Sequence, residues 1–186
     1  MRISRDQAQQ NHDKVVTTAA RLFRERGFEG VAVGDLMKTA GFTHGGFYNH
    51  FNSKDDLSAQ ALDQAFRQMD DHRASVESLD DLLSQYLSEA ARRAPGRACP
   101  AAALAGDVAR QGEPVKRVFA EGFDRMVQSM AQRLPKGPEA RAEAIALLSR
   151  MVGALALARA MPEGSDLGRE VLAAALEACR KDAARA

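Results

Sequence analysis

The chain of 186 residues is long enough for one or two domains with a hydrophobic core, and 45% hydrophobic with 27% charged residues is typical of a globular protein. A net charge of +1 does not by itself indicate a nucleic-acid partner. No apolar run reaches the length of a membrane span, and the polar N-terminus lacks the apolar segment of a secretory signal. We therefore expect a cytoplasmic protein with no membrane partner. The two distant cysteines, Cys99 and Cys179, fit neither a disulfide scaffold nor a zinc site.

Helical patterns fill the chain, and alternating strand patterns are absent, so the expected fold class is all-α. Apolar residues at helical spacing, glycine stops and serine or threonine caps predict nine helices. Their approximate ranges are 12–26, 33–40, 44–51, 53–73, 78–93, 100–111, 114–134, 139–161 and 167–183. No nucleophile elbow, metal-binding cluster or phosphate loop occurs, which predicts a protein that is not an enzyme and has no metal or cofactor.

The stretch HGGFYNHF, residues 44–51, places two adjacent glycines at the start of a short helix, where each costs about 1 kcal/mol relative to alanine. A three-residue turn containing Gly41 separates it from the helix over 33–40, an arrangement typical of a helix-turn-helix. The second helix of that motif enters the major groove of DNA, and close approach there excludes a Cβ atom. Phe47 and Phe51, four residues apart, are expected to anchor this helix inward.

The run AARLFRERGFEGVAVGDLMKTAGFTHGGFYNHFNSKDDL, residues 19–57, resembles the DNA-binding domain of the tetracycline-repressor (TetR) family. The shared pattern is LFxExGF followed by xDLxxxAGxTxGxFYxHFxSKxxL. The resemblance implies a DNA-binding domain over residues 1–54 and a helical ligand-binding and dimerisation domain over 55–186. It also implies a repressor, active as a homodimer on double-stranded operator DNA and released by a small-molecule effector whose identity is unknown.

Carried over by position, the resemblance assigns the DNA-binding residues. Phosphate contacts would come from donor side chains, namely Thr43, Tyr48, His50 and Lys54. Base edges or a thymine methyl group would face His44, Gly45, Phe47 and Asn49. The sequence departs from the family pattern where Val31 and Ala32 replace the usual hydroxyl residues, so a helix cap is missing, and where Gly34 replaces a frequent DNA donor. Fewer charged contacts to DNA are expected as a result.

The segment 139–161 is apolar almost all round, which predicts burial on more than one side. Self-association explains this pattern, and the resemblance implies it, since TetR-like proteins dimerise through their last two long helices. The alternative is a helix wholly internal to one chain. The expected interface residues are Leu148, Met151, Leu155, Leu172 and Leu176.

An effector pocket is expected among the middle helices. Its candidate lining residues are Tyr86, Cys99, Leu104, Phe119, Phe123, Met126 and Met130. Ordinary core packing is the alternative for these residues, because methionine and phenylalanine at helical spacing occur in any helical core.

Cys99 precedes Pro100 and so occupies the N-cap position of a helix, with Arg92, Arg93 and Arg97 close in sequence. The helix dipole and guanidinium charge both favour a thiolate, which leads to the hypothesis of a redox or electrophile sensor, or an enzyme, acting through Cys99. A small buried thiol without chemistry is the alternative. A third class, a helical interaction module, would show neither DNA binding nor thiol chemistry.

Overall fold

The computed structural model describes residues 4–184, so residues 1–3 and 185–186 at the ends of the two expected segments lie outside it. The described range is all-α as predicted, with nine α-helices, two short 3-10 helices and no strand. In chain order these are α1 (Arg5–Arg26), α2 (Val33–Ala40), η1 (His44–Asn49), α3 (Lys54–Ser75), α4 (Leu79–Tyr86), α5 (Glu89–Arg93), η2 (Pro95–Arg97), α6 (Pro100–Val108), α7 (Glu113–Ala131), α8 (Ala140–Ala160) and α9 (Asp166–Ala183).

Serine caps set several helix starts. The Ser53 hydroxyl caps α3 by accepting the Asp56 N–H at 3.0 Å, and the Asp56 carboxylate accepts the N–H of Asn52, the residue before the cap, at 3.0 Å. The bond from the Asn52 N–H lowers the pKa of Asp56 below its usual value. Ser78 caps α4 in the same way, as its spacing to Asp81 predicts.

The first and fifth expected helices differ from the structure. α1 begins at Arg5, because Ser4 caps it by accepting the Gln7 N–H. The expected start at residue 12 is too late because the exposed, polar first turns carry no apolar periodicity. The single helix expected over 78–93 is two helices, α4 and α5, because Ser88 accepts the Ala91 N–H and starts a new helix after a break at Leu87.

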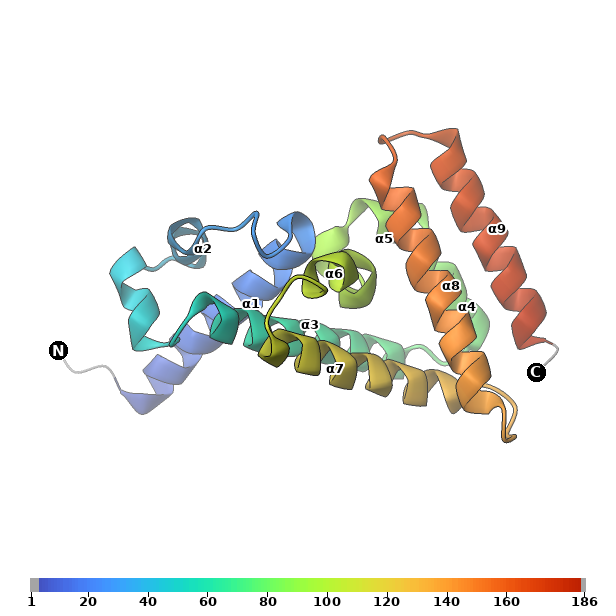
Figure 1. Cartoon of the computed structure of the whole chain (residues 1–186), viewed down its shortest axis with the longest axis horizontal. Coiled ribbons are helices and arrows are strands. Elements are labelled where there is room, and N and C mark those ends of the chain that lie inside the picture. Colours follow the sequence, from blue (N-terminus) through green and yellow to red (C-terminus); the bar gives the residue numbers. More distant parts are fainter. Residues whose placement is uncertain (1–3, 185–186) are drawn as a thin grey trace.

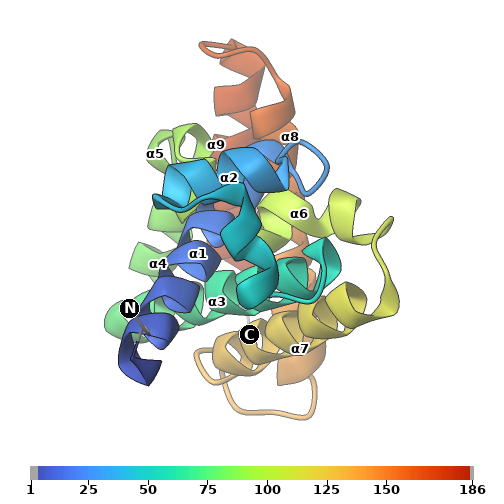
Figure 2. The same cartoon turned by 90° about the vertical axis from the view of Figure 1, so that its left-hand side faces the viewer.

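The helices form an elongated molecule with distinct ends (Figure 1). α1, α2 and η1 occupy the N-terminal end, α3 and α7 run side by side through the middle, and α8 packs against α9 at the opposite end. Figure 2, viewed from the N-terminal end, shows α2 and η1 in front and the α8–α9 pair behind. α3 contacts both α1 and α7, so one hydrophobic core extends from the first helices to the last. No helix in the described range is long and apolar enough to cross a membrane.

The close packing of α3 on α7 depends on a missing side chain. Gly122 is buried on α7, and a Cβ atom built there would lie 2.3 Å from Cδ2 of the Phe66 ring on α3. Phe66 is itself fully buried and cannot rotate away. Gly122 therefore sets the spacing between the two long central helices.

Gly122→Ala is expected to lower the free energy of unfolding by about 1–3 kcal/mol, because the added methyl group overpacks the contact with Phe66. Gly106→Ala on α6 is the control, since a Cβ there has no neighbour within 4 Å and should raise stability by about 0.4–1 kcal/mol. Urea unfolding followed by circular dichroism measures both. Equal effects of the two substitutions would contradict the packing argument.

Candidate functional site

The connection from α2 to η1 has the geometry of a helix-turn-helix. Gly41 adopts a φ of 84°, the left-handed conformation in which glycine is least strained, and its N–H donates to the Lys38 carbonyl at 3.0 Å. The Phe42 N–H donates to the Met37 carbonyl at 2.8 Å, which completes a glycine-terminated helix end. The predicted stop at Gly41 is confirmed. At the other end of α2, Ala32 makes no side-chain capping bond, so the expected missing cap is also confirmed.

The second helix of the motif differs from the prediction. Residues 44–49 form a 3-10 helix rather than an α-helix reaching Phe51, with the Gly46 N–H donating to the Thr43 carbonyl at 3.1 Å. The Thr43 hydroxyl makes no capping bond. Two adjacent glycines weaken the α-helical preference of so short a segment, and the tighter 3-10 turn is common in such pieces.

Phe47 does not face outward. Its side chain is 1% exposed, and its ring centroid lies 5.4 Å from that of Phe51, which is also buried. The prediction that Phe47 contacts bases is therefore wrong, whereas the inward anchoring of both phenylalanines is confirmed. The physical reason is that a six-residue helix needs an apolar anchor to stay on the core, and Phe47 is the large apolar side chain within it.

The remaining candidate DNA-binding residues lie together on the surface of this motif. Thr43, His44, Gly45, Tyr48 and Asn49 are exposed, and His50 and Lys54 are half-buried. Tyr48 is 73% exposed, although a large aromatic ring is normally placed in a core. The Lys54 Nζ lies 3.7 Å from Glu29, but a surface ion pair of this kind is worth about 0–1 kcal/mol. Lys54 thus remains free to pair with a phosphate.

Gly45 has no internal reason to be glycine. Neither Gly45 nor Gly46 has a positive φ, and a Cβ atom on Gly45 would meet nothing within 4 Å. A Cβ on Gly46 would make only ordinary contacts, at 3.7 Å from Met37 and 3.8 Å from Thr43. Within the chain, alanine would therefore fit at Gly45 without a clash.

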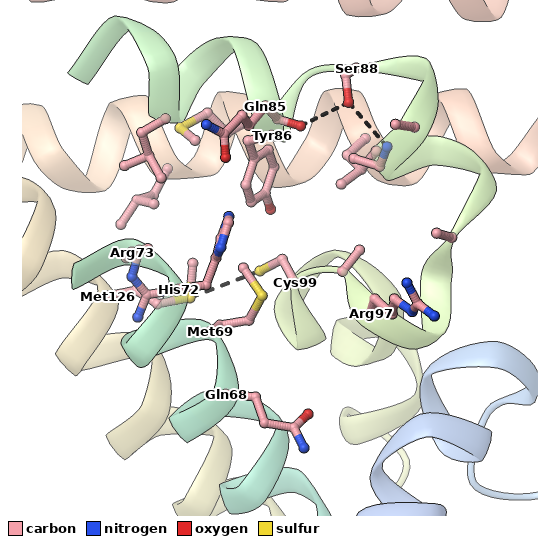
Figure 3. A pocket seen from close by; sticks show the side chains of 18 of the residues that line it. Gln68, Met69, His72, Arg73, Gln85, Tyr86, Ser88, Arg97, Cys99 and Met126 are labelled. Carbon is pink, nitrogen blue, oxygen red and sulfur yellow. Dashed lines mark hydrogen bonds between the residues drawn. The ribbon is translucent and has the colours of Figure 1, made fainter. Parts of the chain in front are cut away.

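A cavity of about 470 Å³ lies between α3, α4, α5, α7, α8 and the chain from η2 to Cys99 (Figure 3). Four of the predicted pocket residues line it, namely Tyr86, Cys99, Met126 and Met130. Its mouth includes exposed residues of α3 and α4, His72 and Gln85. The volume is within the range of about 300–1,000 Å³ that is usual for small-molecule sites.

Leu104, Phe119 and Phe123 do not line this cavity, and their assignment to it is wrong. Leu104 is buried in the core around α6. Phe119 and Phe123 share a stripe of α7 with Met126, but Phe119 lies about 10 Å nearer the N-terminus of the helix. At that level Phe66 of α3 packs edge-on against Phe119, with ring centroids 5.7 Å apart.

The predicted dimer interface is also corrected. Leu148, Met151 and Leu155 are buried within the chain and line the cavity, and Leu172 is buried as well, so these four residues cannot contact a partner. Leu176 is half-buried. The apolar side chains that α8 leaves exposed are Ile145 and Leu157 on its opposite face.

Cys99 occupies the N-cap position of α6, as its sequence context predicts, and of the three expected arginines only Arg97 lines the same cavity. Arg92 donates to the carbonyls of Ala158 and Pro162, both at 2.8 Å, and Arg93 pairs with Glu89. The Cys99 thiol is buried, 4.0 Å from the sulfur of Met126. Cys99 is therefore part of the cavity wall rather than an exposed cationic corner.

Arg24 joins the helix-turn-helix half to the cavity wall. Its buried guanidinium donates to the Ala20 carbonyl at 2.9 Å, the Gln68 side-chain oxygen at 2.8 Å and the Ala98 carbonyl at 3.3 Å. Gln68 and Ala98 both line the cavity. Burial lowers the pKa of Arg24 to about 10, which leaves it charged at neutral pH. Arg24 thus connects α1 to two residues of the cavity wall through hydrogen bonds.

Sequence reasoning missed most other residues of the cavity wall, and the charged one buried among them is Arg73. It continues the buried stripe of α3 that contains Leu62, Phe66 and Met69. A charged residue at helical spacing on an otherwise apolar stripe is the signal that could have identified it.

Comparisons with known proteins agree with this geometry. The family model described as bacterial regulatory proteins, tetR family, matches residues 15–61. A helix-turn-helix transcriptional regulator of Mycobacterium tuberculosis is 30% identical over 161 residues, which cover 79% of this chain and 83% of that protein. The transcriptional repressor DhaR of a Mycobacterium species is 25% identical over 132 residues, covering 67% and 66%. The crystal structure of reduced NemR from E. coli superposes with a TM-score of 0.75 at 19% identity, covering 92% and 96%.

The exposed motif and the all-α scaffold define a helix-turn-helix DNA-binding protein. The chain belongs to the TetR family of bacterial regulatory proteins, as the matches in sequence show, and it is a DNA-binding transcriptional regulator.

Gly45→Ala is expected to lower operator affinity by about 10-fold or more, equivalent to about 1.4 kcal/mol, because its methyl group lies where DNA approaches. Thermal unfolding should be unchanged or slightly improved, since no internal contact is disturbed. Fluorescence anisotropy with labelled operator measures the affinity, and Gly106→Ala is the control for a harmless exposed glycine substitution. Undiminished affinity of the Gly45 variant would contradict the assignment of this face.

Proposed function

We propose that the protein is a transcriptional repressor that binds its operator as a homodimer and is released when a small molecule occupies the cavity. The observation that carries the proposal is the Arg24 guanidinium, which joins α1 to the cavity residues Gln68 and Ala98. The name of the relative DhaR supports a repressor.

The surface residues of the motif make two kinds of contact with DNA, to phosphates and to bases. Thr43, Tyr48, His50 and Lys54 supply hydroxyl, imidazole and ammonium donors for phosphates, which fix the position of the motif on the duplex. His44, Gly45 and Asn49 face the base edges and supply the sequence preference.

Release requires a ligand that binds one arrangement of the helices better than another. A molecule in the cavity contacts the segment before α6 and the α3 wall, where Ala98 and Gln68 hold Arg24. A shift of either acceptor must move α1 or break a buried hydrogen bond, and breaking such a bond costs about 1–3 kcal/mol. The recognition segments of the two protomers then lose their spacing.

The dimer forms through the outer faces of α8 and α9. Ile145 and Leu157 are exposed on α8, and Leu167 is exposed on α9. A stripe of small residues at helical spacing runs along α8 beside Ile145 and Leu157; it consists of Ala142, Ala146, Ser149, Gly153, Ala156 and Ala160. Small side chains allow two helices to approach closely, and the exposed leucines then become buried.

Selection of DNA sequences by the purified protein tests the proposal and should recover a pseudo-palindrome with half-sites about 10 bp apart or a multiple of this. On that site Tyr48→Phe is expected to weaken binding about 10-fold by removing a phosphate donor. Lys54→Ala should reduce the slope of log affinity against log salt concentration by about one, the value for one lost phosphate contact. Lys136→Ala removes an equal charge from the loop between α7 and α8, and it should change neither the operator affinity nor its salt dependence. Similar effects of both lysine substitutions would contradict the phosphate assignment.

Two leucines of α8 that are two positions apart test the dimer face. Leu157 is 59% exposed and Leu155 is 0% exposed, so a glutamate at each position samples opposite sides of the helix. Leu157→Glu is expected to give a folded monomer at micromolar concentration. Leu155→Glu should unfold the chain, at a cost of more than about 3 kcal/mol, because it places a charge in the core. Sedimentation velocity and circular dichroism separate the two outcomes, and a Leu157→Glu dimer as stable as wild type would exclude this interface.

A further inference from the structure

The cavity wall carries buried hydrogen-bond donors without acceptors. Arg73 is 4% exposed, and one of its terminal nitrogens pairs with Asp70. Its Nε and Nη1 atoms are buried with no partner among the described residues. The hydroxyl of Tyr86 is likewise buried without a partner within residues 4–184. Both side chains line the cavity (Figure 3).

Such donors are costly in a folded chain. A buried polar group without a hydrogen bond loses its water and gains nothing in return, which is why native proteins leave few of them. Burial lowers the pKa of Arg73 and raises that of Tyr86, which are the directions expected where the charged form lacks water. An acceptor within reach of these atoms would satisfy donors that the chain itself leaves unpaired.

The charge around the cavity has one sign. Arg73 and Arg97 line it, and within the described part of the chain no aspartate or glutamate does. Asp70, the carboxylate that pairs with Arg73, lies outside the lining and also accepts from Arg125 at 3.0 Å. Arg125 pairs in turn with Asp63 at 3.1 Å. The cavity therefore offers guanidinium charge that its own wall leaves incompletely neutralised.

A further arginine lies close to the same group of side chains. Arg159 of α8 donates to the Ala91 carbonyl at 2.7 Å, but its Nε and Nη1 atoms are buried without an acceptor in the described residues. It is near enough to Tyr86 and Cys99 for both to influence its pKa, which burial lowers. No ion pair of Arg159 occurs in the range 4–184.

The rest of the wall is apolar and adaptable. Four methionines line it, Met69, Met126, Met130 and Met151, together with several alanines and leucines. Methionine side chains adjust to irregular apolar shapes. Figure 3 shows the Tyr86 ring projecting from α4 toward α3, so its hydroxyl is directed into the space that these side chains enclose.

We propose that the cavity binds an organic acid, a carboxylate on an apolar aromatic or aliphatic body. The carboxylate accepts hydrogen bonds from Arg73 and Tyr86, and the body packs among the methionines. The inference rests on the proposed function, since it names the ligand class of the same cavity.

Other ligand classes fit the wall less well. A cationic ligand would be buried beside guanidinium groups of like charge without a carboxylate in the lining. A purely apolar ligand would fill the volume but leave the donors of Arg73 and Tyr86 unpaired. A carboxylate matches the planar fork of a guanidinium and can accept from the phenol at the same time.

Isothermal titration calorimetry of the full chain with two matched pairs tests this inference. The probes are 2-naphthoate against 2-naphthamide and decanoate against decanamide, which differ only in the charged group. At least one acid is expected to bind about 10-fold or more tightly than its amide. Arg73→Gln should abolish this preference, and Tyr86→Phe should reduce it several-fold. Arg67→Gln is the matched control, because Arg67 lies on the same helix but is exposed and outside the cavity.

The inference is overturned if neither acid binds the folded wild type, or if each amide binds as tightly as its acid. It is equally overturned if Arg73→Gln keeps the preference. Should Arg73→Gln fail to fold by circular dichroism, Tyr86→Phe decides, and an unchanged preference in that variant overturns the role of the donors.

Operator titration separates this inference from the proposed function. An acid that binds the cavity without changing operator affinity contradicts ligand-controlled release and supports the ligand class. Release by the amides with no binding of the acids supports ligand control and overturns the ligand class.

Discussion

The buried guanidinium of Arg24 is the constraint on which the arrangement of the two halves depends. A buried charge destabilises the fold unless its donors find acceptors. The acceptors of Arg24 come from three places in the chain, the Ala20 carbonyl, the Gln68 side chain and the Ala98 carbonyl. α1, α3 and the segment before α6 must therefore keep one relative position for all three bonds to form. The helix-turn-helix is held to the cavity wall by this requirement as much as by apolar packing.

Two different sides of α8 are apolar. Its inner face, with Leu148 and Leu155, lines the cavity, and Ile145 and Leu157 elsewhere on the helix stay exposed. An amphipathic helix would serve only one surface. The nearly uniform apolar sequence of α8 follows from burial on one side by the chain itself and, in the proposed dimer, on the other side by a partner.

Local signals explain what could be predicted from the sequence. The end of α2 at Gly41 and the serine caps at Ser53 and Ser78 all depend on hydrogen bonds that span only a few residues. The family resemblance depends on residues 19–57, which contain Gly41 and Ser53, because short-range contacts of this kind fix the spacing within the motif. Where a competing local cap was overlooked, at Ser88, one expected helix proved to be two.

The sequence by itself determined the all-α fold, most helix ends and the helix-turn-helix, because periodicity and caps act within a few residues. Only the tertiary structure decided which side of each helix faces inward. Leu155 proved to line the cavity while Leu157 is exposed, Phe47 proved to be an anchor, and Arg73 proved to be a cavity donor. Each outcome depends on neighbours that are remote in the chain, such as α3 against α7. The hydrophobic effect is not directional, so an apolar stripe indicates that one face of a helix is buried but does not indicate which other element covers that face.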